Sequence, residues 1–426
     1  MRFVSFLPIL LLAACASTSA TPSQSVVKSE RVEPETQVLN TVQADPAFAR
    51  TQRFEAWRED FTRRAIAKGY SPTLLARTVG QARINERAIE RNSNQPEFTR
   101  PVWAYIQSAA NPDRVQRGRA KLSEQAQTLE EIERIYGVPR EILTAIWGLE
   151  SSYGRIQGTH DIISSLATFA FEGRRQEFGE TQLFAALDLI QSGAVRAEQL
   201  KGSWAGAMGM TQFIPTTFRD YAVDFDRNGN TDLWQSEADA LASAANYLTR
   251  SNWQVGQPVM SEVVVPADFD FSQSETVRKS VSDWVAQGVR PANGLQYSPA
   301  ALQLDAKLLV PAGHRGPKIL TFQNFDAIKK YNNSTSYVLG IASLGRALKG
   351  ETAIRTPWPE SDAPVSFEEK KAMQRALTAQ GFDTKGVDGM IGPATRKAIR
   401  DWQSSRGLPA DGYVEQNLFR QIVSQG

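Results

Sequence analysis

One stretch constrains the fold most, because it places an acid on the inward face of a helix. Residues 141–154 (EILTAIWGLESSYG) predict one helix, in which Leu143, Ile146 and Trp147 recur at helical spacing. Glu150 continues this apolar stripe, and Gly154 is a typical C-terminal cap. Burial raises the pKa of a carboxyl group, and a carboxyl that is protonated near neutral pH can donate a proton. Glu150 is therefore either a catalytic acid or a structural residue paired with an arginine.

The composition disfavours several other kinds of site. The chain has 426 residues, enough for two or three domains with a sizeable core. Its formal net charge of +2 gives no strong field, so nucleic acid is not an expected partner. The only histidines, His160 and His314, lie far apart in sequence, which leaves a histidine zinc site or a Ser-His-Asp triad poorly supplied. Cys15 is the single cysteine, so no internal disulfide can form.

The first fifteen residues have the character of an export signal. They combine a basic residue, an apolar run and small residues, and they are too short to span a membrane as a helix. The segment Leu12-Ala-Ala-Cys15 resembles the lipobox of bacterial lipoproteins, which implies cleavage before Cys15 and its lipidation. A plain secretory signal with an incidental cysteine is the alternative. Several acyl chains would anchor the chain firmly, and Ala16, where a retention signal has Asp, favours the outer membrane by the same resemblance.

Helical periodicity dominates most of the remaining chain. Residues 16–45 lack any such rhythm and predict a flexible tether. We predict helices near residues 54–61, 72–79, 97–108, 115–136, 141–154, 162–171, 181–191, 325–330 and 335–348. Residues 257–325 differ, because short β-rich runs broken by Pro and Gly predict a small mixed α/β insertion.

The C-terminal part predicts a linker and a second, small domain. Three prolines mark residues 349–365 as a linker. Residues 367–380 and 395–407 predict two amphipathic helices, and Val414 and Leu418 supply apolar positions for a third. Asp411-Gly412 repeats Asp388-Gly389, a weak internal repeat of one turn. The predicted fold is mainly α: a helical domain with a small α/β insertion, followed by a three-helix domain.

A glycine-rich segment at residues 200–215 is unlike the helices around it. It is small and apolar, with Ser203 and Gln212 among its few polar residues. Glycines allow a backbone to approach a ligand closely, and they also allow tight packing between helices. Both interpretations remain open from this segment alone.

Three separated motifs together resemble one enzyme family. The segments Glu150-Ser-Ser-Tyr-Gly154, Lys201 to Phe213 and Tyr331 to Tyr337 occur in the order found in lytic murein transglycosylases of the membrane-bound B type, whose core resembles goose-type lysozyme. The resemblance covers residues 51–350. The C-terminal unit is similar to the peptidoglycan-binding domain of wall enzymes, with Trp402 where Phe is usual.

This resemblance implies a reaction that needs a single protein carboxyl. The family cleaves the β-1,4 bond between N-acetylmuramic acid and N-acetylglucosamine and leaves a 1,6-anhydro ring, and substrate-assisted reactions of this kind dispense with the usual carboxylate pair. Glu150 would act first as acid and then as base. The resemblance implies a substrate role for further residues at matching positions: Ser203, Gln212, Tyr105, Tyr247, Tyr331, Tyr337, Asn332, Arg174 and Arg175. Each tyrosine could equally be a core aromatic. Met210 and Thr211 depart from the commoner family pattern.

An acidic loop is a separate candidate site. Oxygen-bearing residues alternate along it, with Gly229 at the sixth position as in an EF-hand: Asp224, Asp226, Asn228 and Asn230. Gln235 replaces the usual twelfth-position carboxylate, and the resemblance offers Asp239 instead, one residue further along than expected. The loop is therefore either a structural Ca²⁺ site or a turn held by its own side chains. No cofactor is expected for catalysis.

These observations give a domain scheme and a functional hypothesis. We expect a signal with lipobox (residues 1–15), a tether (16–45), a lysozyme-like catalytic domain (46–350), a linker (351–366) and a peptidoglycan-binding domain (367–426). The expected function is a lytic transglycosylase at the periplasmic face of the outer membrane of a Gram-negative bacterium, with glycan strands and other wall-synthesis or wall-degrading enzymes as partners. A hydrolytic muramidase and a non-catalytic wall-binding lipoprotein are the alternatives.

Overall fold

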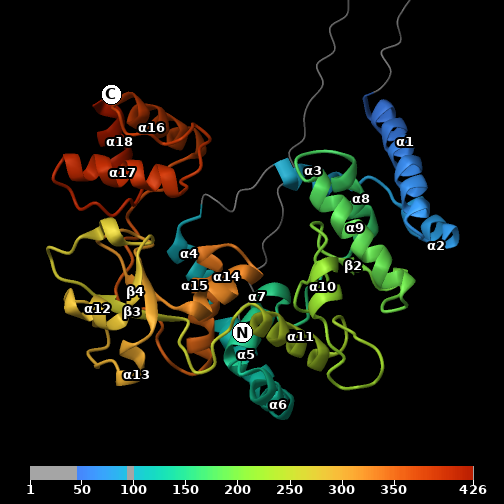
Figure 1. Cartoon of the computed structure of the whole chain (residues 1–426), viewed down its shortest axis with the longest axis horizontal. Helices are drawn as coiled ribbons and strands as arrows, with labels where there is room; N and C mark the ends of the chain where they lie inside the picture. Colours follow the sequence, from blue (N-terminus) through green and yellow to red (C-terminus); the bar gives the residue numbers. More distant parts are fainter. Residues whose placement is uncertain (1–45, 94–99, 426) are drawn as a thin grey trace, which may run out of the picture. The chain divides into compact units, whose positions relative to one another are not determined.

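A computed structural model of the chain describes residues 46–93 and 100–425. The predicted signal, Cys15 and the tether lie outside these residues. Residues Ala49–Gly426 form one compact unit, which holds almost all of the described structure. Most of this unit is helical (Figure 1), which confirms the predicted fold class.

The helices of the catalytic part come from both sides of the insertion in the sequence. They are α1 (Pro46–Ala67), α2 (Pro72–Arg77), α3 (Glu86–Ser93), α4 (Val102–Ala109), α5 (Pro112–Glu124), α6 (Ala126–Tyr136), α7 (Arg140–Ser151), α8 (Ile162–Phe171), α9 (Gln176–Gln191), α10 (Pro215–Tyr221), α11 (Glu237–Arg250), α14 (Gln323–Tyr331) and α15 (Thr335–Leu348). Short pieces connect them: 3₁₀ turns η1 (Val79–Gln81) and η3 (Ala197–Gln199), and the antiparallel strands β1 (His160–Asp161) and β2 (Lys201–Gly202).

The central helix of the core is α7. Every residue from Ile142 to Gly148 is buried, and Trp147 is fully enclosed. Helices α5, α6, α11 and α15 pack around α7, while α8 and α9 lie side by side (Figure 1). A helix enclosed on nearly all sides positions its last turn, which carries Glu150, with little freedom.

The single long helix predicted over residues 115–136 is wrong, because the structure has two. α5 ends at Glu124, Gln125 leaves the helical conformation at φ −105° and ψ 22°, and α6 begins at Ala126. α5 packs against α7 and α15, whereas α6 packs mainly against α11. Both halves contain good helix formers and the break has neither Pro nor Gly, so the bend follows from tertiary packing rather than from local sequence.

The insertion is a five-stranded antiparallel sheet with its own core. Its strand order is β4–β6–β7–β3–β5, with the central β7 (Lys318–Thr321) pairing β3 (Met260–Val264) and β6 (Asp305–Leu309). The predicted β-rich runs correspond to these three strands. The remaining elements are β4 (Arg278–Ser280), β5 (Arg290–Pro291), η4 (Phe271–Gln273), α12 (Val281–Ala286) and α13 (Pro299–Leu302). Trp284 fills the core, and its indole N–H donates to the Ala306 carbonyl at 3.0 Å.

The segment between α15 and the C-terminal helices has no helix or strand, yet it is attached along its length. Ile354 and Trp358 pack on the main core. The buried Glu262 carboxylate accepts two successive backbone N–H groups, of Arg355 and Thr356, at 2.7 and 2.8 Å. These contacts fix the course of the chain between the catalytic helices and the C-terminal module.

The C-terminal module is a three-helix unit with a separate small core. It consists of α16 (Phe367–Ala379), α17 (Pro393–Ser405) and α18 (Gln416–Ser424), grouped at the C-terminus in Figure 1. Trp402, at the position where the resembling domains have Phe, is 1% exposed, and its indole N–H donates to Gln380 Oε1 at 2.9 Å. The module therefore accommodates the larger ring in its core.

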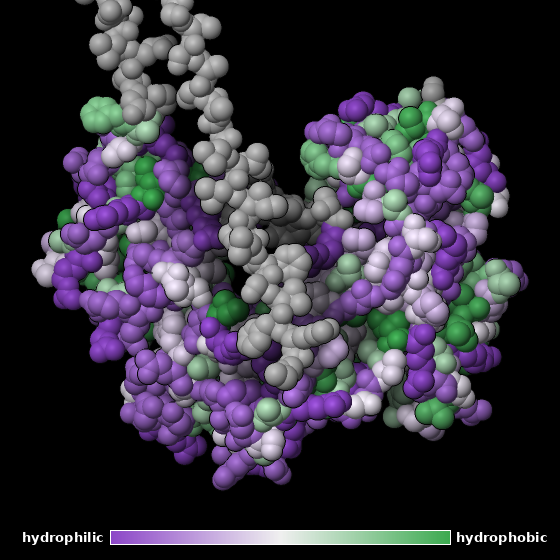
Figure 2. Space-filling model, turned by 180° about the vertical axis from the view of Figure 1, so that it is seen from behind, coloured by the Kyte–Doolittle hydropathy of each residue, from purple (hydrophilic) through white to green (hydrophobic). Residues whose placement is uncertain are grey.

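Hydrophilic residues cover most of the face shown in Figure 2, and the hydrophobic residues visible there form small separate groups. Within the described part of the chain, no helix is both long and apolar enough to cross a membrane.

Candidate active site

Glu150 lies at the end of α7, and the chain turns back immediately after it. The helix ends at Ser151, and residues 152–154 all adopt left-handed backbone, with φ between 52° and 81°. The predicted cap at Gly154 is therefore wrong, because the helix stops earlier. The reason is Tyr153, whose ring packs edge-on against Trp147 with centroids 5.7 Å apart. That contact folds the chain back over the last turn of the helix and leaves Glu150 at its rim.

A tyrosine from a helix far along the chain holds the Glu150 carboxyl. Tyr337, in the first turn of α15, is 4% exposed, and its hydroxyl donates to Glu150 Oε1 at 2.6 Å. Ser334 caps this helix by accepting the Tyr337 backbone N–H, which fixes where the helix begins. Burial raises the pKa of Glu150 to about 7, and the hydrogen bond from Tyr337 opposes part of that rise. Glu150 is therefore close to half protonated at neutral pH.

No cation neutralises Glu150 among the residues that the structure describes. Its pKa responds to burial and to Tyr337 alone. The alternative of a structural Glu–Arg pair, left open by the sequence, therefore has no partner in the described residues. A carboxyl without a cation keeps access to its protonated form, which a paired carboxylate would lose.

The other predicted tyrosines form a connected aromatic group beside Glu150. The rings of Tyr247 and Tyr331 lie 5.1 Å apart, nearly perpendicular, and both contact Phe213. The Tyr331 hydroxyl donates to the Thr211 carbonyl, and the Tyr247 hydroxyl donates to the Lys330 carbonyl at 2.7 Å. Both hydroxyls are therefore engaged within the protein.

Tyr105, on α4, reaches the same region from another direction. Its ring packs against Gly340 of α15. Burial and the nearby charge of Glu150 raise the pKa of Tyr105 to about 12. Burial, again with the charge of Glu150, raises the pKa of Tyr331 as well. These phenols stay neutral hydrogen-bonding groups across the physiological pH range.

The glycine-rich segment forms a tight hairpin against the end of α7. Met208 and Phe213 exchange two backbone hydrogen bonds, and the Ser151 hydroxyl donates to the Met210 carbonyl at 2.6 Å. A Cβ at Gly202 would lie 2.0 Å from the Ala207 carbonyl oxygen, so this glycine is required for packing within the hairpin. Gln212 has φ of 50°, a strained conformation for a residue other than glycine.

The two polar residues predicted in this hairpin are both partly exposed. Ser203 Oγ accepts the backbone N–H of Ala205 and Ala207, which leaves its own proton free to be donated. The Gln212 side-chain amide donates to the carbonyls of Gln157 and Gly209, at 3.1 and 2.8 Å. Its N–H groups are thus used to hold the hairpin, and its carbonyl oxygen is the group left for a ligand.

The three remaining predicted residues lie in loops. Arg174 and Arg175 occupy the turn between α8 and α9, where Arg175 precedes the first residue of α9. Burial and the charge of Arg174 lower the pKa of Arg175, and neither has a carboxylate partner within residues 46–93 and 100–425. Asn332 is exposed and follows the last residue of α14. None of the three contacts Glu150.

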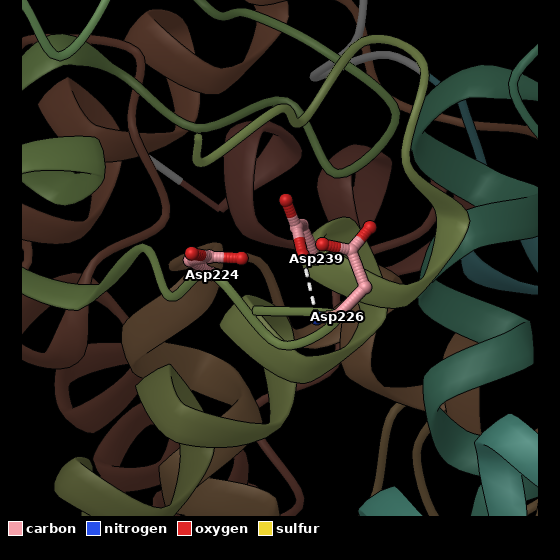
Figure 3. Close-up of side chains that lie close together, drawn as sticks. All are labelled: Asp224, Asp226 and Asp239. Carbon is pink, nitrogen blue, oxygen red and sulfur yellow. Dashed lines mark hydrogen bonds between the residues drawn. The ribbon is translucent and has the colours of Figure 1, made fainter. Parts of the chain in front are cut away.

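Three aspartates of the predicted metal loop converge (Figure 3). One carboxylate oxygen from each of Asp224, Asp226 and Asp239 lies within 4.8 Å of the others. Asp239, fully buried in the first turn of α11, accepts the backbone N–H of Phe225 and of Asp232, each at 2.8 Å. Burial raises the pKa of Asp239, and the neighbouring charge of Asp226 raises it further.

The asparagines of this loop contribute backbone hydrogen bonds. The Asn228 N–H donates to both Asp224 and Asp226 at 3.1 Å, and Asn228 Oδ1 accepts the Asn230 N–H at 2.9 Å. Side-chain bonds thus hold the turn, as one sequence interpretation expected. The repulsion among three clustered carboxylates is what a cation would relieve.

Comparison with known proteins assigns the catalytic part to a family. Residues 53–346 match the transglycosylase SLT domain, and residues 368–422 match the putative peptidoglycan-binding domain. The chain is 30% identical over 372 residues to membrane-bound lytic murein transglycosylase B of Escherichia coli, covering 82% of this chain and 97% of that protein. The chain belongs to the SLT transglycosylase family.

Solved structures of transglycosylases have the same fold. SltB3 from Pseudomonas aeruginosa, in complex with NAG-anhNAM-pentapeptide, is 46% identical and superposes with a TM-score of 0.84, covering 87% of this chain and 99% of that one. A lytic transglycosylase of Escherichia coli in complex with calcium, SLT35, is 30% identical with a TM-score of 0.60, covering 68% of this chain and 92% of that one.

Several residues that hold the tyrosines and the hairpin beside Glu150 had no role predicted from the sequence. Thr211 supplies the carbonyl for Tyr331, Ser151 attaches α7 to the hairpin, and Gln157 holds Gln212. Phe213 packs under two tyrosines. Each acts through backbone or packing contacts with residues distant in sequence. Only the position of Ser151, directly after Glu150, offered a signal.

Proposed function

We propose that Glu150 is the single acid and base of this peptidoglycan lytic transglycosylase. The observation that carries the proposal is a half-buried carboxyl whose pKa is raised by desolvation to about 7 and which accepts a hydrogen bond from a neutral tyrosine. No second carboxylate of the described residues perturbs Glu150, Tyr105 or Tyr331. Glycosidases that use two carboxylates place them about 5–9.5 Å apart, where a second charge would act on all three groups.

The reaction involves two successive proton transfers, and the Glu150 carboxyl takes part in both. Protonated Glu150 donates its proton to the glycosidic oxygen as the bond to the muramyl C1 breaks, and the N-acetyl group of the muramyl sugar assists. The resulting carboxylate then takes the proton from the muramyl O6, which attacks C1 and closes the 1,6-anhydro ring. No water is consumed, and Glu150 returns to its protonated form. A pKa close to the working pH suits a group that performs both steps.

We assign roles to the surrounding residues according to which of their hydrogen-bonding groups are not already used within the protein. Ser203 can donate its hydroxyl proton and Gln212 can offer its amide oxygen, so we assign them to the N-acetyl and lactyl groups of the muramyl sugar. Tyr337 positions Glu150. Tyr247 and Tyr331 offer the substrate their ring surfaces, because their hydroxyls are bonded within the protein. Tyr105 and the exposed Asn332 are the remaining residues that we assign to substrate contacts.

We assign the two arginines to the peptide part of the substrate. Arg174 and Arg175 have no carboxylate partner in the described chain, and guanidinium groups bind carboxylates with paired hydrogen bonds. The peptide stems of peptidoglycan carry such carboxylates.

The products of digesting purified sacculi test the mechanism. Mass spectrometry of the released fragments should find 1,6-anhydromuramyl ends, whereas reducing ends would support the hydrolytic muramidase instead. Glu150→Gln should abolish release, because glutamine cannot supply or accept the proton. Release that is undiminished in Glu150→Gln would exclude the mechanism, and no release by the parent chain would favour the non-catalytic wall-binding alternative.

We also propose that the chain acts in the cell envelope of a Gram-negative bacterium as a lipoprotein of the outer membrane. The support is the lipobox-like segment at Cys15 and a relative that is membrane-bound by name. Cys15→Ser should move the protein from the membrane fraction to the soluble periplasm; a variant that stays in the membrane fraction would contradict lipidation. Association with other wall-synthesis or wall-degrading enzymes stays a prediction, which co-purification with the tagged full chain would test.

A structural Ca²⁺ is our proposal for the aspartate cluster. The donor set suits this cation, because three converging carboxylates supply the hard oxygen ligands that Ca²⁺ prefers. Asp224, Asp226 and Asp239 would hold the ion, which would neutralise their repulsion and stabilise the loop. Melting temperature should rise when Ca²⁺ replaces EDTA in the buffer, and Asp226→Asn should reduce that rise. An identical melting temperature in both buffers would favour the turn held by its own side chains.

A further inference from the structure

The C-terminal module contains the same hydrogen-bonded turn twice. In the first copy, Asp388 Oδ1 accepts the side-chain N–H of Gln374 and the backbone N–H of Met390, both at 2.8 Å. Gln374 Oε1 in turn accepts the Gly389 N–H at 2.8 Å. The glutamine comes from α16, and α17 begins five residues after the aspartate.

The second copy repeats these bonds atom for atom. Asp411 Oδ1 accepts the side-chain N–H of Gln403 and the backbone N–H of Tyr413, at 2.8 and 2.9 Å. Gln403 Oε1 accepts the Gly412 N–H at 2.8 Å. Here the glutamine comes from α17, and α18 begins five residues after the aspartate. The weak repeat of the sequence is therefore a structural repeat.

The second carboxylate oxygen distinguishes the two copies. Asp411 Oδ2 is occupied: it accepts the backbone N–H of His314 at 2.8 Å and lies 2.7 Å from His314 Nδ1. A Cβ at Gly313 would lie 2.6 Å from that oxygen, so the approach of this segment requires a glycine. Asp411 is consequently 4% exposed. The carboxylate of the second turn thus binds another segment of the same chain by accepting hydrogen bonds from the N–H groups of His314.

The first turn presents the same oxygen to solvent. Asp388 is exposed, and its Oδ2 has no hydrogen-bond partner in the described part of the chain. Hydrogen bonds from Gln374 and Met390 lower the pKa of Asp388, so the group is a carboxylate at neutral pH.

Partly exposed apolar side chains belong to the same turn or pack on it. Val387 and Met390, on either side of the Asp388-Gly389 pair, are 42% and 43% exposed. The Phe367 ring lies over Gly389, where a Cβ would be 2.5 Å from it, and Phe367 is itself 46% exposed. A hydrogen-bond acceptor bordered by apolar groups suits a ligand with an N–H group beside small aliphatic side chains.

We propose that the turn at Asp388 binds the peptide stem of peptidoglycan, with Asp388 Oδ2 accepting an amide or ammonium N–H as Asp411 Oδ2 accepts those of His314. This inference rests on the proposed function, which makes peptidoglycan the substrate. The two copies then have different roles: the second turn attaches the module to the insertion, and the first turn binds peptidoglycan. Peptide stems combine backbone N–H groups with alanine methyl groups, which match the carboxylate and its apolar border.

The test is binding of the full-length Glu150→Gln chain to purified sacculi, measured by co-sedimentation. Asp388→Asn in this background keeps the acceptor for Gln374 and Met390 but replaces Oδ2 by an NH₂ group, so we expect binding to weaken about tenfold. Met390→Ser, which removes an exposed side chain and leaves the backbone bonds intact, should weaken binding too. Asp401→Asn is the matched control, because it removes one charge from an exposed Lys397 pair of the same module.

Two outcomes would overturn the proposal. One is equal binding by Asp388→Asn, Met390→Ser and Asp401→Asn. The other is equal binding of the Glu150→Gln chain to sacculi stripped of their peptides by an amidase, which would make glycan the ligand. The proposed function is judged separately, by the release of anhydro-ended fragments by the chain with Glu150 intact. Asp388→Asn should keep its rate on short soluble muropeptides, because that turn lies outside the catalytic residues.

Discussion

The hydrogen bond from Tyr337 to Glu150 makes a quantitative prediction about the pH dependence of the enzyme. Tyr337→Phe removes the hydroxyl that donates to Oε1 at 2.6 Å, and leaves the buried ring in place. The bond favours the ionised carboxylate, so its loss must raise the pKa of Glu150 above the present value of about 7.

The size of the shift follows from the strength of the bond. A hydrogen bond to a charged group contributes about 1.5–3 kcal/mol, and one pKa unit corresponds to about 1.4 kcal/mol. Because the hydroxyl can also bond the neutral acid, the lower limit applies, and we expect a rise of about one unit. At pH 8 the protonated fraction of Glu150 would then increase from about 10% to about 50%.

The assay is the release of anhydromuropeptides as a function of pH, expressed as kcat/KM. Glu150 must be protonated to start the reaction, so activity falls as pH rises through its pKa. Tyr337→Phe should lower the maximal rate, because Glu150 is less well positioned, and should move the alkaline limb upward by about one unit. Tyr297→Phe removes a hydroxyl bonded to Ser261 in the insertion and should leave that limb unmoved. An unmoved or lowered limb in Tyr337→Phe would refute the assignment of Glu150 as the acid.

Three further predictions follow from the same contacts. Burial raises the pKa of Glu150 above its ordinary 4.5, so the folded protein loses stability as pH rises from 4.5 to about 7 and the buried carboxyl ionises. Glu150→Gln removes this cost and should increase the free energy of unfolding by up to about 3 kcal/mol at pH 8. Urea titrations should find no difference between the two proteins below pH 4.5. Gly148→Ala would place a Cβ 2.7 Å from the Tyr153 ring, and we expect a loss of about 1–3 kcal/mol of stability together with activity, measured by denaturant unfolding and by fragment release. Arg175→Gln should raise KM for substrates that carry peptide stems and leave KM unchanged for peptide-free glycan, since the Arg175 side chain has no carboxylate partner to lose among residues 46–93 and 100–425.

Local periodicity was enough to place most helices, and it failed where tertiary packing decides. α8 and α15 have the predicted bounds, because a continuous apolar stripe meets a clear capping residue at each start. The break at Gln125 has no local signal, because the two helices it separates differ only in their packing partners. The strands β4 and β5 have three and two residues, too few for an alternating pattern to be recognised.

The residues of the candidate site came from local spacing and from the resemblance, but the way they assemble did not. Its position on an apolar stripe made Glu150 the candidate acid, because helical spacing is a property of the local sequence. Its partner Tyr337 lies 187 residues further along, and no spacing rule connects the two. The match to family motifs supplied that position. Neither source predicted the engaged hydroxyls of Tyr247 and Tyr331, which depend on backbone carbonyls brought close by the fold.

The choice of a tyrosine rather than a cation beside Glu150 explains how one carboxyl can serve both steps. An arginine in place of Tyr337 would hold Glu150 ionised and remove the acid on which bond cleavage depends. Burial, with the nearby charge of Glu150, keeps the pKa of Tyr337 well above its ordinary value, so the phenol remains neutral in both steps. A neutral donor can bond the protonated acid and the carboxylate in turn, and burial of the carboxyl sets the balance between them near neutral pH. Desolvation thus raises the pKa of Glu150, as the charge of a second carboxylate does in enzymes that use a carboxylate pair. With no second carboxylate to act as nucleophile, the muramyl O6 hydroxyl takes that role.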